Sequence, residues 1–121
     1  MYDAIRPNVL PAPPAPVVLE VEDGDSLAIG GGATVLHVPG HTPGSIALYL
    51  AAERILFTGD TIASVETTPI LGPFNCDRAA AIRSFRRLAA LDVRLACFGH
   101  GSPLRGEDVP AMLAAAASTA R

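Results

Sequence analysis

The sequence lacks a long hydrophobic run, because no stretch of about 18 or more apolar residues occurs in it, and this excludes a membrane-spanning helix. It also lacks lysine, so all nine basic residues are arginine, a bias that fits a GC-rich bacterial genome. The net charge is −3 and no basic patch is visible, which argues against a nucleic-acid partner. We therefore expect neither a membrane nor a nucleic acid as a partner.

Cysteine is scarce, and Cys76 and Cys97 form no CxxC metal pair. We expect free thiols in a cytoplasmic protein, with Cys97 as a small buried hydrophobic residue. A serine nucleophile elbow and a glycine-rich phosphate loop are also missing; Gly30–Gly32 precedes a strand and indicates a turn. The first residues lack a basic start followed by an apolar core, so we expect no signal peptide.

Apolar residues are abundant, at 50% of the chain, and this indicates apolar surface that is available to a partner. The length of 121 residues allows one domain. Five prolines lie in residues 1–16, and such a segment is extended and cannot pack a core. We therefore divide the chain into a proline-rich extended segment, 1–16, and a single domain, 17–121.

Short apolar runs between turn residues predict strands, namely 17–21, 26–29, 33–38, 45–50, 55–58 and 95–98. Residues 61–74 are expected to form an irregular loop. Apolar residues at helical spacing then predict a helix over 78–91 capped by Asp77, and a last helix after Asp108 with Pro110 in its first turn. This order predicts an α/β fold, a mixed α+β sheet with helices on one face.

Three polar residues each follow a predicted strand. His41 lies in PGHTPGS, Asp60 ends FTGD, and His100 lies between two glycines in FGHG. Imidazole and carboxylate ligands suit Zn²⁺, Fe²⁺ or Mn²⁺, so these residues make a plausible metal site. A turn histidine at 41 and a loop cap at 60 are the alternatives. We interpret His37, the third histidine, as structural or solvent-facing.

The elements HVPGHTPGS, LFTGD and FGHG, in this order, resemble the metallo-β-lactamase-fold hydrolase superfamily over residues 17 to 110. The resemblance implies that His41 binds a first metal, Asp60 bridges two metals and His100 binds the second. The first metal motif of that family, HxHxDH, is absent. The chain thus resembles the C-terminal half of an αβ/βα sandwich, and residues 1–16 resemble the segment that crosses between the halves.

Half a sandwich would leave one apolar sheet face uncovered. We expect a homodimer that packs sheet against sheet, because the family fold consists of two similar halves. The expected contact residues are Val35, Ile46, Leu48, Ile55 and Phe57.

The resemblance implies metal-dependent hydrolysis, with Asp60 holding the metal and orienting water and with residues 61–74 facing the substrate. We expect at most one ion per chain, zinc or else iron or manganese, held by His41, Asp60 and His100. Because the ligand set is incomplete, we expect the chain alone to be weakly active or inactive. Two alternatives stay open: a non-catalytic truncated half-domain that dimerises, and a subunit completed by a separate half that carries HxHxDH.

Overall fold

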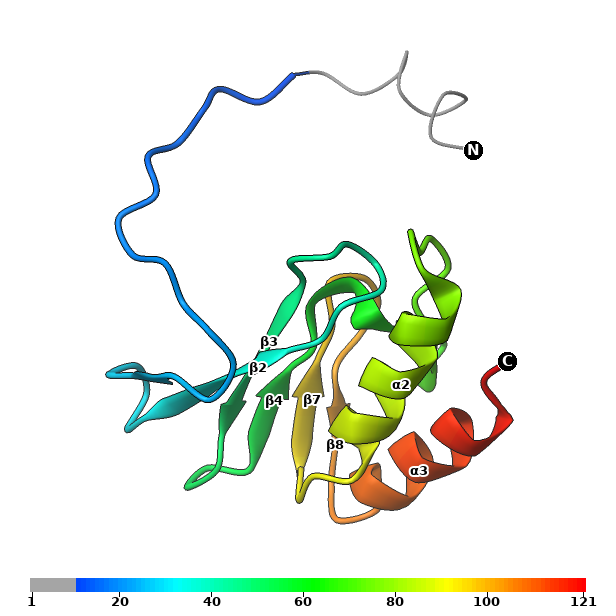
Figure 1. The fold of residues 1–121 in the computed structure, drawn as a ribbon. Helices are drawn as coiled ribbons and strands as arrows, with labels where there is room; N and C mark the ends of the chain where they lie inside the picture. The colour runs from blue at the N-terminus through cyan, green and yellow to red at the C-terminus, as the bar shows by residue number, and fades with distance from the viewer. Residues whose placement is uncertain (1–10) are drawn as a thin grey trace.

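The structure is a computed structural model that describes residues 11–121. Six strands form one mixed sheet in the order β1-β2-β3-β4-β7-β8, while β5 and β6 form a separate hairpin (Figure 1). The elements are β1 (Ser26–Leu27), β2 (Ala33–His37), β3 (Ile46–Leu50), β4 (Ile55–Phe57), the 3₁₀ turn η2 (Gly59–Thr61), β5 (Ile62–Val65), β6 (Thr68–Leu71), α2 (Arg78–Ala89), β7 (Leu95–Cys97), β8 (Leu104–Arg105) and α3 (Val109–Thr119).

Strands β2, β4 and β7 run in the same direction. β3 is antiparallel to both β2 and β4, whereas β7 pairs with β4 in parallel. Helices α2 and α3 both lie on one side of the sheet (Figure 1). The predicted architecture, a mixed sheet with helices on one face, is confirmed.

The core lies between this sheet and the two helices. Side chains on alternate strand positions point toward the helices, since successive residues of a strand face opposite sides. The buried cluster includes Leu36, Ala47, Leu56, Ala96 and Leu104 of the sheet, Phe85 and Leu88 of α2, and Leu113 of α3. The apolar stripe predicted for the first helix is therefore the stripe that closes the core.

The two helices begin differently. Asp77 caps α2 as predicted, because its carboxylate accepts a hydrogen bond from the Ala80 N–H at 3.0 Å. Asp108 occupies the corresponding position before α3, but its side chain makes no capping hydrogen bond. Pro110 lies in the first turn of α3, where a missing N–H has no cost.

The predicted strand over 17–21 is wrong, and so is its hairpin with 26–29. No strand forms in residues 11–21, and β1 pairs instead with β2. The turn before β1 holds this arrangement, because Gly24 donates to the Val35 carbonyl and the Asp25 carbonyl accepts from Val35. Of the predicted extended segment 1–16, residues 1–10 lie outside the described residues, and 11–16 are exposed and without regular structure.

The prediction of an irregular loop over 61–74 is also wrong, because β5 and β6 form an antiparallel hairpin there. Its two turn residues, Glu66 and Thr67, have φ angles of 50° and 65°. A two-residue turn of this kind is normally signalled by Asn-Gly or Asp-Gly, so Glu-Thr gives no warning of it. Pro69 is tolerated in β6 because a two-stranded sheet consists only of edges.

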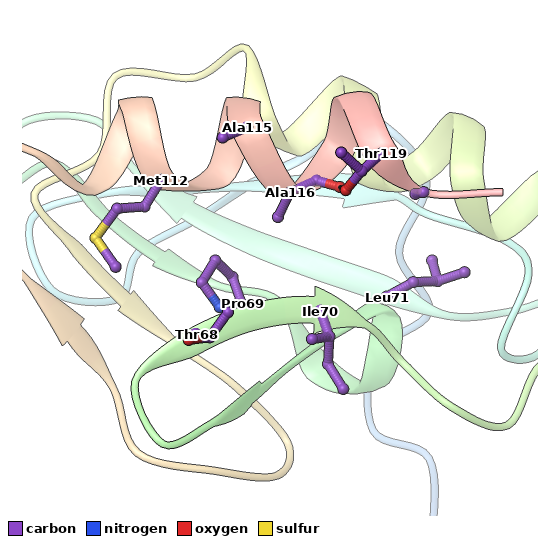
Figure 2. A pocket seen from close by; sticks show the side chains of 9 residues that line it. Thr68, Pro69, Ile70, Leu71, Met112, Ala115, Ala116 and Thr119 are labelled. Carbon is purple, nitrogen blue, oxygen red and sulfur yellow. The ribbon is translucent and has the colours of Figure 1, made fainter.

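A groove of about 440 Å³ separates this hairpin from α3 (Figure 2). β6 forms one wall, and Met112, Ala115, Ala116 and Thr119 of α3 form the other. The groove is apolar and contains none of the candidate metal ligands. We therefore place the chemistry of this protein elsewhere.

The second face of the sheet carries no helix. Leu48 of β3 lies opposite Phe57 of β4, which lies opposite Cys97 of β7, and Ile55 lies opposite Leu95. We call this surface the open face and define it by Ile46, Leu48, Ile55, Phe57, Leu95 and Cys97. Val35 shares this side but is fully buried, so the expectation that it contributes exposed surface is wrong.

Both cysteines are free, as predicted; Cys76 is exposed and Cys97 is partly buried. None of the described helices is long and apolar enough to cross a membrane. His37 is exposed and donates from Nε2 to the Pro43 carbonyl at 2.7 Å. It thereby fixes the loop between β2 and β3, which confirms its structural interpretation.

Candidate metal centre

The three candidate ligands lie at one edge of the sheet. His41 follows β2, Asp60 follows β4 and His100 follows β7. Because these three strands run in the same direction, their carboxyl ends meet at the same edge. The topology thus brings together three residues that are distant in the sequence.

The loop that carries His41 is seated on the start of α2. Gly40 has a φ of 144°, and a Cβ there would overlap with the Ala81 backbone, so only glycine fits. The Gly40 carbonyl accepts from Asp77 at 2.9 Å and the His41 carbonyl accepts from Cys76 at 3.2 Å. These contacts fix the backbone of His41 relative to the helix.

The ring of His41 is oriented by a second contact. Its Nδ1 atom lies within hydrogen-bond distance of the Phe74 carbonyl oxygen. A carbonyl oxygen can only accept, so Nδ1 carries the proton and Nε2 points the other way. Nε2 lies 3.2 Å from Oδ2 of Asp60.

Asp60 is held in the 3₁₀ turn η2, directly after β4. The Gly59 carbonyl accepts from Gly99 at 2.9 Å, which ties this turn to the loop after β7. A Cβ at Gly99 would overlap with Asp60 Oδ1, and a Cβ at Gly72 would overlap with the Asp60 carbonyl oxygen. Two glycines therefore make the space in which Asp60 sits.

His100 completes the group from the other side. Its Nε2 lies 3.4 Å from Asp60 Oδ1, and its side chain is 79% exposed. Its backbone carbonyl accepts from Ser64 of β5 at 3.1 Å. A Cβ at Gly101 would overlap with the Ser64 carbonyl oxygen, so the hairpin packs tightly against this loop.

The structure thus brings together all three residues that the sequence singled out, but as two pairs. Each imidazole faces a different oxygen of Asp60. Residues 11–121 contain no group of three or more His, Cys, Asp or Glu side chains arranged to hold one ion. The Asp60 carboxylate lies between the two histidines, and the expectation of one ion held by all three residues stays a prediction.

Sequence reasoning missed the partners that orient these ligands. The Phe74 carbonyl is a backbone group, so its residue type gives no signal. Ser64 lies in a segment for which the sequence predicts an irregular loop. Only the glycines around His100 give a hint, because a glycine pair allows close approach of the backbone to another group.

Comparisons with known proteins identify the family of this chain. The family model of the metallo-beta-lactamase superfamily matches residues 2–100. Hydroxyacylglutathione hydrolase of Cereibacter sphaeroides is 37% identical over 87 residues, which are 70% of this chain and 33% of that protein. The chain thus spans about a third of the length of this curated relative.

Two solved structures share the fold. A metallo-beta-lactamase family protein from Thermus thermophilus is 31% identical with a TM-score of 0.65, over 87% of this chain and 36% of that chain. TTHA1623, solved in a di-iron-bound form, is 32% identical with a TM-score of 0.65, over 87% of this chain and 52% of that chain. The family match covers most of the sequence, and the chain therefore belongs to the metallo-beta-lactamase superfamily.

Proposed function

We propose that this chain carries one part of a metal-dependent hydrolase site, in which His41, Asp60 and His100 bind the metal. The observation that carries this proposal is the convergence of both histidine Nε2 atoms on the two oxygens of Asp60, at 3.2 and 3.4 Å. Metal-binding relatives support it, since one structure of similar fold is di-iron-bound.

The donor chemistry fits a cation at this point. Because Nδ1 of His41 donates to Phe74, neutral His41 presents a lone pair at Nε2 toward a carboxylate oxygen. Two acceptors at this distance repel each other unless a proton or a metal ion lies between them. Imidazole nitrogen and carboxylate oxygen together suit zinc, iron or manganese.

Bound metal would supply Lewis-acid polarisation of the substrate and an activated water. The residues of the chain have the tasks of holding and orienting. Asp60, as the central carboxylate, is the residue that we assign to catalysis, because it faces both histidines. The Phe74 carbonyl orients His41, and the exposed Phe74 side chain beside it forms a wall for the substrate.

Thioesters are the substrate class to test first. The curated relative described above is a hydroxyacylglutathione hydrolase, which names a glutathione thioester as its substrate. We propose hydrolysis of this class, in the cytoplasm, where the two free thiols would stay reduced. Activity of the chain alone is expected to be low, because each oxygen of Asp60 has a single histidine beside it.

A second candidate function follows from the exposure of His100. Its side chain is 79% exposed, which favours a subunit whose site is completed by a separate half that carries HxHxDH. A non-catalytic half-domain is the remaining possibility.

One assay separates these functions. Hydrolysis of a hydroxyacyl-glutathione thioester is measured with added Zn²⁺ or Mn²⁺ for the wild-type chain and for Asp60→Asn. Slow turnover that Asp60→Asn abolishes supports the hydrolase proposal. Turnover that appears only when a separate HxHxDH-bearing half is added supports the second function. No turnover in either case, together with unaltered metal affinity in Asp60→Asn, would reject both.

A further inference from the structure

The buried polar side chains of this chain gather beside the candidate metal ligands. Among the residues that the structure describes, Thr58 and Thr61 are buried on either side of Asp60 in the chain. The other buried polar side chains are Ser64 on β5 and Ser84 on α2, both among apolar neighbours. A hydroxyl group that is buried without a hydrogen bond is costly, so each of these serines needs a partner.

Ser64 finds its partner in the loop that carries His100. Its backbone N–H donates to the His100 carbonyl at 3.1 Å, and its Oγ donates to the Ser102 carbonyl at 2.5 Å. Between these two bonds, Gly101 has a φ of 96° and leaves no space for a Cβ beside Ser64. Ser64 thus fixes the backbone on both sides of Gly101, in the turn that begins with the candidate ligand.

Ser84 has the same relation to the loop that carries His41. It lies on the buried side of α2, and its Oγ donates to the Pro39 carbonyl at 2.8 Å. About one turn earlier in α2, the backbone of Ala81 lies so close to Gly40 that no Cβ would fit there. The hydrogen bond and the close contact together seat the residues before His41 on the helix.

We propose that the buried hydroxyls of Ser64 and Ser84 are positioning groups, and that each orients one histidine toward Asp60. This inference rests on the proposed metal site, and it assigns the orientation of each histidine to one serine. His100 depends on Ser64 more strongly than His41 depends on Ser84. The reason is that the His100 side chain is 79% exposed, whereas the ring of His41 also contacts a backbone carbonyl.

The first measurement distinguishes positioning from general stabilisation and needs no metal. Long-range proton–nitrogen NMR spectra of the histidine rings are recorded for the metal-free chain at fixed pH, with His37 as the internal reference. We expect Ser64→Ala to shift the ring signals of His100 and Ser84→Ala to shift those of His41, while the reference stays unchanged. Serines that only stabilise the fold would leave the rings of both candidate ligands unshifted.

The second measurement is the affinity for Zn²⁺, determined by competition with a chelator. We expect it to fall about 10–100-fold in Ser64→Ala and by a smaller factor in Ser84→Ala, because partners that orient a ligand contribute factors of this size. Val93→Ala is the control, since Val93 is fully buried just before β7, at the opposite end of that strand from His100. It should lower stability and bind zinc like the wild type.

A further variant, His100→Ala, separates this inference from the proposed function. If His100→Ala lowers zinc affinity while Ser64→Ala and Ser84→Ala bind zinc like the wild type, the serines are not positioning residues and the metal site stands. If His100→Ala binds zinc as tightly as the wild type, the metal site is rejected and the inference falls with it. An equal loss of affinity in Val93→Ala and in the serine variants would also overturn the inference, because general stability would then explain both.

Discussion

The two faces of the central sheet are built from alternating residues of the same strands, yet only one is closed. In β4, Leu56 points toward the helices and is fully buried, whereas Phe57 points the other way and is 43% exposed. Both residues are large and apolar, so composition does not explain the difference. What differs is the cover, because α2 and α3 lie over one face only. Alternation along a strand decides where a side chain points, but the neighbouring layer decides whether it is buried.

The largest expected effect on stability is at the closed face, which is the side of the sheet that α2 and α3 cover. Leu56→Ala should lower the free energy of unfolding by about 2–5 kcal/mol, because it leaves a cavity among residues that cannot collapse around it. The loss should be the same at all protein concentrations, as measured by urea denaturation. Phe57→Ala is the matched change on the open face, and its loss should be smaller, because the Phe57 side chain is already 43% exposed. Equal losses in the two variants would show that the two faces are equally closed.

The next largest effect is expected on metal affinity, at the edge of the sheet where the candidate ligands lie. Gly99→Ala places a methyl group where Asp60 Oδ1 now lies, so the carboxylate must rotate away from His100. We expect metal affinity to fall about 10–100-fold, as for changes that disturb the orientation of a ligand. Competition with a zinc chelator measures this affinity.

Gly44→Ala is the control for this change, because its new methyl group meets no atom within 4 Å. It lies in the same loop as His41 and should leave metal affinity unchanged. If both variants lose affinity equally, the space beside Asp60 is not what matters.

The third prediction concerns the N-terminus of α2, one of the two helices that cover the closed face. Asp77→Ala removes the capping bond to Ala80 and should cost about 0.5–2 kcal/mol of stability. Asp108→Ala makes the same chemical change before α3, where no capping bond exists, and should cost much less. Thermal melts of the two variants would refute this assignment if their stabilities changed alike.

The smallest expected effect lies at the far end of the sheet from the candidate metal ligands. Arg54 donates to Glu107 at 3.0 Å, and this hydrogen bond holds the pKa of Glu107 below its ordinary value. A lowered pKa means that the pair stabilises the fold above the unfolded-state pKa of the carboxyl group, and that this contribution disappears as the pH falls through the folded-state value. Glu107→Gln should therefore make stability slightly less dependent on pH in the acidic range. Glu107 is exposed and Arg54 is only partly buried, so the change should be small. A steeper acid dependence in the variant contradicts the assignment.

Residue patterns predict the elements that depend on local signals. The α2 helix, its Asp77 cap and the strands β2, β3, β4 and β7 follow from apolar spacing and turn residues. The positions of the three candidate ligands follow from polar residues after strands, although their division into two pairs requires the geometry. The grouping of Phe57 with Leu48 on one face also needs the strand register.

Two segments could not be predicted, for different physical reasons. The β5–β6 hairpin turns at Glu66-Thr67, which lacks the usual turn residues, and its strands are stabilised by packing against the His100 loop. The segment 17–21 has the composition of a strand, but its backbone finds no partner among residues 22–121. Strand propensity reports only that a residue fits a sheet, and pairing has to be supplied by a neighbour.

The central claim is that His41, Asp60 and His100 bind metal, and equilibrium dialysis against Zn²⁺ tests it most directly. The wild type is compared with His41→Ala and with His37→Gln, a histidine variant outside the site that keeps a hydrogen-bond donor near Pro43. We predict that His41→Ala lowers zinc affinity at least tenfold while His37→Gln matches the wild type. Equal zinc affinity in the wild type and His41→Ala would contradict the metal site.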